Sequence, residues 1–198
     1  MKPFVAAGLG CRKGCKAEEI AALVRSALGE VGFELSALSG LFAPAFKQGE
    51  AGLAEAATSL GVPLVLIPQA ALEAASAHAV SRTQFGKPLA GFQLVQQLIA
   101  NIAVQANAAR QVYQAAARLL DNGADARVEC SMSKYFCSEA ANQVATRAVQ
   151  VFGAAGLMEG NVAERLFRDA REATIGEGTS QMQVLQIGTA LLGVSAVR

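Results

Sequence analysis

The chain has 198 residues, of which 53% are hydrophobic, and its 17 basic and 16 acidic residues give a formal net charge of +1. A chain of this length can bury a sizeable core as one large domain or two small ones. The balanced charge excludes binding to nucleic acid or to anionic membranes through charge alone. No stretch approaches the roughly 20 apolar residues of a membrane span, and the N-terminal apolar run is too short for a signal peptide. We therefore expect a cytoplasmic protein.

The four cysteines, Cys11, Cys15, Cys130 and Cys137, predict reduced thiols rather than a metal site. Three residues separate Cys11 from Cys15, which is a poor match to zinc-ligand spacing, and the chain has a single histidine. Cys130 and Cys137 are two helical turns apart on one face, as packing residues commonly are. We expect no bound metal.

The first part of the sequence alternates between strand and helix patterns. Apolar runs predict strands at residues 4–10, 35–46 and 63–68, and helices are predicted at 17–32 and 50–61. Strands that alternate with helices indicate right-handed crossovers and a parallel sheet. We therefore predict an α/β N-terminal unit with a small parallel sheet, over residues 1–75.

The loop after the first predicted strand, "GLGCRKG", carries most of the chemistry in this part. Gly8 and Gly10 allow a tight turn, and Arg12 and Lys13 come just before a helix N-terminus, where carboxylate or phosphate is favoured. The glycine spacing is one residue out from the dinucleotide fingerprint and does not match a P-loop. An anion-binding loop and an ordinary strand-to-helix turn both remain open.

Residues 4–75 resemble the C-terminal domain of the CobE/CbiG family of cobalamin biosynthesis. The segments that match are "GLGCRKG", "AEEI", "FKQGEAGL" and "LGVPL". The family continues through a further glycine- and alanine-rich stretch, so the sheet would be truncated here. The resemblance implies binding of a corrin-ring precursor by a corrinoid site made of Gly10, Cys11, Arg12, Gly14, Lys47 and Glu50.

The second part of the sequence is dominated by helical periodicity. From Phe92 apolar residues recur in steps of three and four until "DNG", which predicts a helix of about 30 residues. Further helices are predicted at 126–152, 162–173 and 180–193, the last with Ser180 and Gln183 placed as a capping box. The segment 69–86 is a shortened first helix. These elements predict an all-α helical bundle over residues 76–198.

Four separated segments of this part are similar to the C-terminal helical domain of acyl-CoA dehydrogenases: "SRTQFGKPLAGFQ", "SMSKYFCSEAANQVATRAVQVFGAAG", "ERLFRDAREATIGEGTSQMQ" and "LLG". The likeness covers about residues 80 to 195 in order. The family oxidises acyl-CoA thioesters to 2-enoyl-CoA with FAD, and a carboxylate in its "EGT" motif removes the α proton. By this resemblance Glu177 is the catalytic base and Gly178 contacts the substrate.

The chemistry explains why these residue types are used. An α C–H is a weak acid, so the base must have its pKa raised when the substrate excludes water, and the thioester oxygen needs a fixed donor, such as the Glu177 backbone N–H. The guanidinium of Arg82 suits a phosphate because its planar fork binds oxygens bidentately. The resemblance implies a set of FAD-binding residues: Arg82, Phe85, Gln93, Gln150, Gly153, Thr179 and Gln181.

Two residues depart from the family pattern. Ala154 stands where a second glycine is usual, and Gly176 replaces an aromatic residue, which suggests a roomier acyl pocket. The N-terminal helical domain and the β-barrel of the family have no counterpart. His78, on the shortened helix, is expected to have a packing or surface role.

The sequence thus predicts two modules joined without a linker near Ala70 to Ser81, as a fusion. Three functions follow. The first is an FAD-dependent acyl-CoA dehydrogenase that is partial or completed by another subunit. The second is a cobalamin-biosynthesis protein with a helical appendage, and the third is a non-catalytic dimerisation partner of a full dehydrogenase. The expected partners are an acyl-CoA substrate, a second copy or a partner dehydrogenase subunit, and an electron-transfer acceptor protein.

Overall fold

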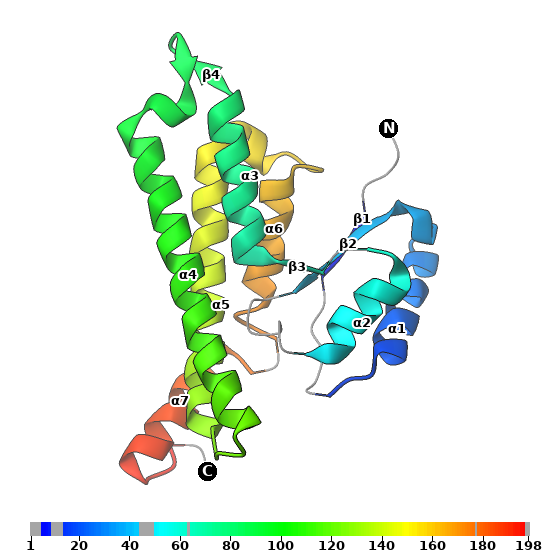
Figure 1. Ribbon diagram of the computed structural model, residues 1–198, viewed down its shortest axis with the longest axis vertical. Helices are drawn as coiled ribbons and strands as arrows, with labels where there is room; N and C mark the ends of the chain where they lie inside the picture. The colour runs from blue at the N-terminus through cyan, green and yellow to red at the C-terminus, as the bar shows by residue number, and fades with distance from the viewer. Residues whose placement is uncertain (1–4, 9–13, 44–49, 63, 177, 197–198) are drawn as a thin grey trace.

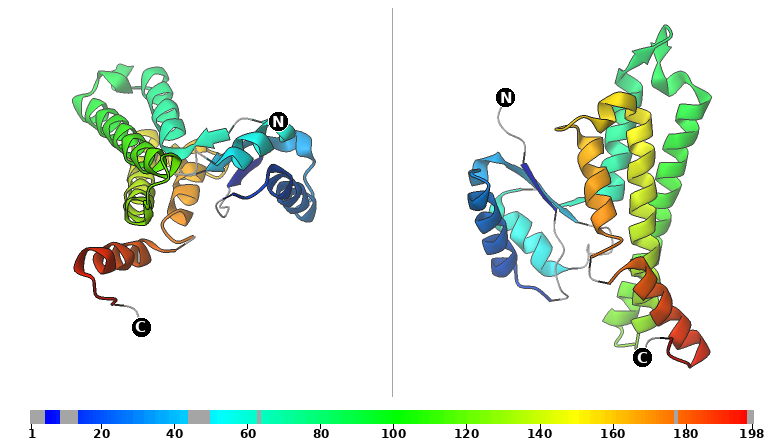
Figure 2. Two further views of the ribbon diagram at one scale, coloured as in Figure 1. Left: turned by 60° about the horizontal axis from the view of Figure 1, so that its bottom comes forward. Right: turned by 180° about the vertical axis from the view of Figure 1, so that it is seen from behind.

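The computed structural model describes residues 5–8, 14–43, 50–62, 64–176 and 178–196. A bundle of long helices forms one part of the molecule, and a small sheet with two helices forms the other (Figure 1). Two further views show that the sheet stands beside the bundle, on the side where α6 lies (Figure 2). The predicted all-α bundle is confirmed.

The sheet is parallel, with its three strands β1 (Val5–Gly8), β2 (Leu38–Ala43) and β3 (Leu64–Leu66) in sequential order. Its register places Leu41 of the central strand between Ala7 and Leu64. Each crossover contains a helix, because parallel neighbours cannot be joined by a tight turn. These helices are α1 (Ala17–Glu30) and α2 (Ala51–Leu60).

α1 and α2 pack against each other and against the sheet, and this contact has its own hydrophobic core. Ile20, Val24 and Leu28 recur on one face of α1 with helical spacing, and they are buried. Leu53 of α2 and Leu41 of β2 are fully buried in the same cluster. Burial of each such side chain stabilises the fold by about 1.5–3 kcal/mol.

The bundle is built from α3 (Ile67–Ser81), α4 (Gln93–Asp121), α5 (Arg127–Phe152) and α6 (Val162–Glu172). α3 and α5 run towards one end of the bundle, and α4, which lies between them in the sequence, runs in the opposite direction along the outer side of the bundle (Figure 1). α4 packs mainly against α5, and α3 packs against α4, α5 and α6. The ends of α3 and α5 therefore meet at the same end of the bundle.

Small side chains dominate the core of the bundle. Alanines face one another from α3, α5 and α6, and only a few large residues, such as Ile102 and Leu166, fill the remaining space. A methyl group lets two helix backbones approach more closely than a leucine does, so the helices pack tightly. The fully buried alanines of this cluster are Ala71, Ala75, Ala141, Ala145, Ala148 and Ala170.

The last helix, α7 (Ser180–Leu192), packs against the first half of α5, at the end of the bundle opposite to the end of α3. A hydrogen bond from Ser131 Oγ to Gln186 Oε1 (2.9 Å) joins the two helices. Leu191 and Leu192 on α7 are largely exposed. α7 thus contacts the rest of the chain along one side only.

The junction between the two parts differs from the sequence prediction. The third strand is expected to reach residue 68, but β3 ends at Leu66 and α3 begins at Ile67 without a linker. Pro68 does not end the strand, because it lies in the first turn of α3. A helix leaves its first N–H groups unbonded, so proline is tolerated there. The predicted boundary between residues 75 and 76 falls inside α3.

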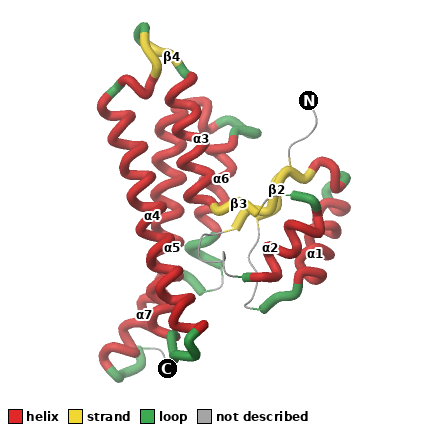
Figure 3. The backbone as a smooth tube through the Cα atoms, in the orientation of Figure 1, coloured by secondary structure: helices red, strands yellow, loops and turns green. Residues whose placement is uncertain are grey.

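Several short elements were not predicted in their observed form. Residues 35–46 contain a short 3-10 helix, η1 (Leu35–Ala37), before β2. After α3 the chain forms a hairpin of β4 (Thr83–Gln84) and β5 (Lys87–Pro88), which Figure 3 shows at the tip of the bundle. The 3-10 helices η3 (Leu89–Gly91) and η4 (Gly153–Leu157) follow β5 and α5. Within the described residues, no helix is long and apolar enough to cross a membrane.

Candidate functional site

A cavity of about 510 Å³ lies where the ends of α3 and α5 meet the start of α4. Three predicted cofactor residues line it: Arg82 from the residue after α3, Gln150 from the last turn of α5, and Gly153 from the start of η4. Leu94, Val95 and Leu98 of α4 also line this cavity, as do Leu89 and Gln84. The parallel course of α3 and α5 thus brings together residues that are far apart in the sequence.

Gly153 ends α5 in a conformation that a side chain would strain. Its φ is 62° and its ψ is −143°, and its N–H donates to the carbonyl oxygens of Val149 and Gln150. An L-residue rarely adopts this region of φ/ψ space, so glycine suits the end of the helix. A Cβ built here meets no atom within 4 Å, so the requirement is one of backbone conformation. Ala154, the departure from the family pattern, also lines the cavity.

His78 forms a wall of the same cavity with Phe152. Their rings are stacked with centroids 4.2 Å apart and an interplanar angle of 18°. Burial, and then the charge of Arg82 one turn further along α3, hold the pKa of His78 below its ordinary value of 6.5. The stack agrees with the packing role expected for His78, but its contact with the cavity could not be predicted from residue spacing.

The hairpin places Phe85 outside this cavity. Phe85 is 92% exposed, and its φ of 52° is the one positive value among the described non-glycine residues. The centroids of the Phe85 and Phe92 rings are 6.2 Å apart, with an interplanar angle of 76°, so the two rings make an edge-to-face contact. Lys87 Nζ lies 4.3 Å from the centre of the Phe92 ring. Gln93, the first residue of α4, is exposed and does not line the cavity. The hairpin therefore presents an aromatic ring to solvent beside the site.

The remaining predicted residues lie at the start of α7. Glu177 is outside the described residues. Gly178 has a φ of 95°, and its carbonyl accepts a hydrogen bond from Gln183 Nε2 (3.3 Å). Thr179 is the N-cap of α7, because its Oγ1 accepts from the Met182 N–H (3.3 Å). Gln181 is exposed on the first turn.

This geometry corrects the predicted capping box. Ser180 is the first helical residue and not the cap, and Gln183 donates to Gly178 rather than returning to the backbone of Ser180. The Thr179 hydroxyl acts as an acceptor in the cap, and its own proton can still be donated to a ligand. The cap is thus one residue earlier than the sequence pattern indicates.

Side chains from α5 hold the segment on either side of position 177. Ser180 Oγ donates to Glu139 Oε1 (2.6 Å), and the Ser180 N–H donates to the Thr174 carbonyl (3.0 Å). Lys134 is buried and its Nζ donates to the Ala173 carbonyl (2.7 Å). A Cβ on Gly176 would stand only 2.2 Å from Glu172 Oε1, so a side chain there requires Glu172 to move. Ala173, before position 177, and Ser180, after it, are therefore each bonded to side chains of α5.

The predicted cofactor residues form two groups in one chain. Gln150 and Gly153 are at the end of α5, whereas the α7 group is held by Glu139, near the middle of α5. Gln150 is eleven positions after Glu139, which corresponds to roughly 16 Å along a helix. Thr179 and Gln181 do not line the cavity that Arg82 lines.

The predicted corrinoid site is described only in part. Gly10, Cys11, Arg12 and Lys47 lie outside the described residues. The Gly14 N–H donates to Glu50 Oε2 (3.1 Å), so these two predicted residues are in contact. Both line a cavity of about 840 Å³ between the first turns of α1 and α2 and the facing sides of α4 and α5.

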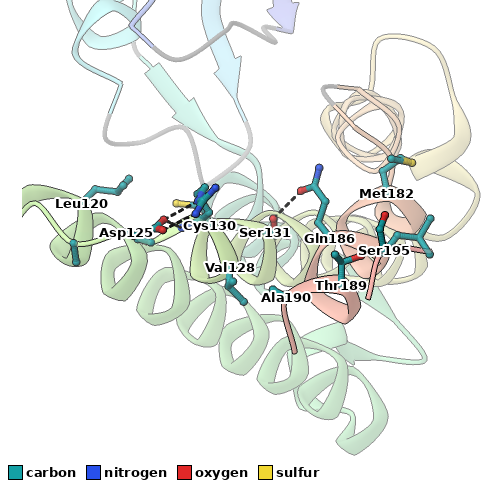
Figure 4. Close-up of a pocket in the computed structure, with 14 residues that line it drawn as sticks. Leu120, Asp125, Val128, Cys130, Ser131, Met182, Gln186, Thr189, Ala190 and Ser195 are labelled. Carbon is teal, nitrogen blue, oxygen red and sulfur yellow. Dashed lines mark hydrogen bonds and ion pairs between the residues drawn. The ribbon is translucent and has the colours of Figure 1, made fainter. Parts of the chain in front are cut away.

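A third cavity, of about 860 Å³, was not anticipated from the sequence. Figure 4 shows it between the end of α4, the start of α5 and α7. Its walls are mainly apolar, with Leu120, Val128 and Met182 among them. The pair formed by Arg127 and Asp125 (2.7 Å) is exposed at its edge. None of the predicted site residues lines it.

The described cysteines do not form a metal site. In the part of the chain that the structure describes, no three His, Cys, Asp or Glu side chains gather as metal ligands would. Cys137 is fully buried, and its thiol donates to the Ala109 carbonyl (3.3 Å). Burial raises the pKa of this thiol to about 11, so it stays protonated at neutral pH.

The bundle, its long helices and the motifs at its ends define a class of protein. The family model of the acyl-CoA dehydrogenase C-terminal domain matches residues 46–192. The chain belongs to this family, as its helical motifs predict. The match leaves residues 1–45 outside it, and the resemblance of the N-terminal part to cobalamin-biosynthesis proteins stays a prediction.

Individual relatives agree with this assignment. The chain is 40% identical over 152 residues to the caffeyl-CoA reductase-Etf complex subunit CarC of Acetobacterium woodii. The aligned region covers 76% of the chain and 39% of CarC. The structure of butyryl-CoA dehydrogenase from Megasphaera elsdenii is 36% identical in sequence, with a TM-score of 0.62. The match covers 71% of the chain and 35% of the butyryl-CoA dehydrogenase chain.

A glutaryl-CoA dehydrogenase from Mycobacterium smegmatis, solved in complex with FADH2, matches 74% of the chain and 36% of its own length. Its identity to the chain is 26% and the TM-score is 0.64. Family neighbours of this kind are FAD-dependent. The chain spans less than two fifths of the length of each of these three proteins.

Proposed function

We propose that this chain is the helical component of an FAD-dependent acyl-CoA dehydrogenase, which removes hydrogens from the α and β carbons of an acyl-CoA thioester. One observation carries the proposal: Arg82, Gln150 and Gly153 line a single cavity at the end of the bundle, within the segment that the family model matches. Residues chosen by motif alone thus converge in space.

The residues of this cavity fit the diphosphate of a dinucleotide. The guanidinium of Arg82 offers a planar fork of donors, which suits two phosphate oxygens. Gln150 adds an amide, and Gly153 leaves its backbone uncovered by a side chain. Among the residues that the structure describes, no acidic side chain lines the cavity. A pair of negative charges would therefore meet donors on several sides and no like charge.

The reaction would use the segment before α7. FAD supplies, when bound, the hydride acceptor. Glu177 takes the α proton, and its pKa rises when the acyl chain displaces water, which makes it a stronger base. The Glu177 backbone N–H donates to the thioester oxygen, where negative charge develops. A Cβ on Gly178 would stand 2.8 Å from Gln183 Nε2, so glycine at this position leaves room for the Gln183 side chain. Ser180 anchors the start of α7 to Glu139.

The division of the predicted cofactor residues supports completion by a second polypeptide. Arg82, Gln150 and Gly153 share a cavity, but Thr179 and Gln181 lie elsewhere in the same chain. A second copy or a partner dehydrogenase subunit would supply the missing half of each site. CarC is a subunit of a complex that contains Etf, and we extend to this chain the proposal of an electron-transfer protein as acceptor.

The test is a titration of the purified full-length chain with FAD, followed by acyl-CoA under anaerobic conditions. We expect flavin binding, and bleaching of the flavin absorbance when a suitable acyl-CoA is added. Glu177→Gln should bind FAD normally. Its rate of flavin bleaching should fall by at least about a hundredfold, because the amide cannot accept the α proton. Full bleaching in Glu177→Gln would remove the assigned base.

A mixing experiment separates the catalytic role from a structural one. The same titration is repeated with a full-length acyl-CoA dehydrogenase from the same cells. Flavin that binds only in this mixture, and that bleaches equally in wild type and Glu177→Gln, identifies a non-catalytic dimerisation partner. A chain that stays colourless in both experiments contradicts the FAD proposal as a whole.

One contact favours a second function, corrinoid-precursor binding by the N-terminal part. Gly14 and Glu50 belong to the predicted corrinoid site, and their hydrogen bond places them together beside a cavity of about 840 Å³. A shift in the absorbance of a corrin-ring precursor on addition of the chain, reduced in Glu50→Gln but not in Arg82→Gln, would support this reading. An unchanged spectrum would reject it.

A further inference from the structure

His78 is positioned to take part in ligand binding at the cavity that Arg82 lines. Arg82 directly follows the last residue of α3, and its N–H donates to the His78 carbonyl (2.9 Å), so the two residues are one turn apart, and both line the cavity. The imidazole is held in place by its stack on Phe152, with ring centroids 4.2 Å apart. A side chain fixed in this way loses little conformational freedom when a ligand binds.

The surroundings of His78 contain one charge that acts on it, and that charge is positive. Arg82, the residue after α3, is the charged neighbour that affects His78. The facing wall from α5 and η4 consists of Gln150, Val151, Phe152, Gly153 and Ala154, and the wall from α4 consists of Leu94, Val95 and Leu98. β4 and η3 contribute Gln84 and Leu89. Arg82 and His78 are therefore the two residues of this lining that can carry charge, and both are bases.

A cavity with these properties favours an anion, and its affinity should depend on one proton. Two cations on adjacent turns suit the two phosphates of a diphosphate group better than one cation does. The face of Phe152 also stabilises a positively charged ring stacked on it. Each of these contacts is stronger for the imidazolium than for the neutral imidazole.

We propose that His78 is a second phosphate-recognition residue of this cavity, which binds a diphosphate-bearing ligand in its protonated form beside Arg82. The inference rests on the proposed function, since FAD is the diphosphate ligand in question, and it deepens that proposal by making binding proton-linked. The ligand class is defined by its diphosphate, so FAD, ADP and inorganic pyrophosphate are all expected to respond.

The direction of the pH dependence follows from linkage. In the free protein, burial and Arg82 keep the pKa of His78 below its ordinary value, so the ring is neutral at pH 7. A bound diphosphate raises this pKa, because an adjacent anion favours the charged form. Affinity therefore rises as the pH falls through the pKa of the complex, and it levels off below the pKa of the free protein.

The single histidine makes the test direct, because its ring proton signal in an NMR spectrum belongs to one residue. The full-length chain is titrated from about pH 5 to pH 8, a range that brackets the ordinary pKa of histidine, with and without saturating pyrophosphate at matched ionic strength. We expect the His78 midpoint to lie below its ordinary value and to rise by about one pH unit with pyrophosphate.

Calorimetry in buffers of different ionisation enthalpy provides the second readout. FAD, ADP and pyrophosphate should each bind with uptake of a fraction of a proton. The affinity for each ligand should rise by about five- to tenfold between pH 8 and pH 5.5. His78→Phe keeps a ring on Phe152, so the fold should persist while proton uptake disappears. His78→Gln serves the same purpose if the phenyl variant unfolds. Arg82→Gln should weaken binding at every pH.

The outcomes separate the inference from the proposed function. An unmoved His78 midpoint under saturating FAD or ADP overturns the inference and leaves flavin binding intact. If the His78 midpoint moves with pyrophosphate and FAD does not bind, the diphosphate site is upheld and the flavin proposal is rejected. Absence of binding by all three ligands overturns both. Equal proton uptake in wild type and His78→Phe assigns the proton to another group and also overturns the inference.

Discussion

Phe85 combines an exposed ring with a backbone conformation that bulky residues avoid. Phe85 and Gly86 occupy the two central positions of the hairpin turn, and both have positive φ, 52° and 77°. A two-residue turn of this kind favours asparagine, aspartate or glycine at its first position. A large side chain in the left-handed region costs about 1–2 kcal/mol. Such local strain is characteristic of functional sites, where a side chain is kept for what it binds.

We therefore predict that Phe85→Asn stabilises the protein and weakens FAD binding. Asparagine tolerates the left-handed region, and little buried area is lost because the Phe85 ring is 92% exposed. The net gain in the free energy of unfolding should be about 0.5–1 kcal/mol, after loss of the edge contact with Phe92. Urea unfolding measures the first effect, and FAD titration measures the second.

Gly86→Ala is the matched control, because it adds a side chain at the next turn position, whose φ is 77°. It should destabilise the hairpin by about 1 kcal/mol. Destabilisation by both substitutions would show that the Phe85 ring makes a net structural contribution. FAD affinity that is the same in wild type and Phe85→Asn would remove Phe85 from the proposed flavin site.

At the scale of one element, the start of α7 shows how a cap positions a candidate site. Thr179 accepts the Met182 N–H, Gln183 donates to Gly178, and Ser180 bonds to Glu139 of α5. The Thr179 contact satisfies one of the N–H groups that a helix start leaves unpaired, and the Ser180 contact ties the helix start to α5. The cap and its neighbouring contacts therefore position the described residues that follow the candidate base.

Thr179→Ala should lower the free energy of unfolding by about 1 kcal/mol, because the N-cap hydrogen bond is lost. Gln181→Ala, at an exposed position two residues later, should change it by less than about 0.5 kcal/mol. Thermal unfolding of the two variants beside wild type compares these effects. Equal stability of the two variants would mean that the cap contributes no more than an exposed side chain.

Periodicity predicted the long helices well because amphipathic spacing over many residues is a strong signal. α4 and α5 are close to their expected bounds. The ends of elements were harder, because several residues compete for the same local role. Thr179, Ser180 and Gln183 all suit a helix start, and Pro68 suits either the end of a strand or the first turn of a helix. Tertiary contacts decide between such alternatives.

At the scale of the whole molecule, the candidate site depends on how the helices are directed. Motifs selected Arg82 and Gln150 separately, but their common cavity exists because α3 and α5 end together. His78 lines the same cavity and stacks on Phe152. No spacing in the sequence reveals this contact between α3 and α5. Residue types could thus be predicted, whereas their convergence could not.

The division of the chain into two modules can be tested at α3. The boundary at 75/76, which we proposed from the sequence, would cut this helix in its middle. Ile67, Ala71 and Ala75 precede the cut, and each is at most 1% exposed in the bundle core. Removal of these residues leaves the facing surfaces of α5 and α6 without partners.

We expect a fragment of residues 62–198 to fold and a fragment of residues 76–198 to be less stable by at least about 3 kcal/mol. The shorter fragment lacks a fully buried isoleucine, whose loss alone costs about 2–5 kcal/mol, and two core alanines. Urea unfolding followed by circular dichroism compares the two. The longer fragment keeps Arg82, Gln150 and Gly153, so its pyrophosphate affinity should equal that of the full chain. Equal stability of the fragments would place the start of the helical unit at residue 76, whereas unfolding of both would show that the bundle requires the sheet beside it.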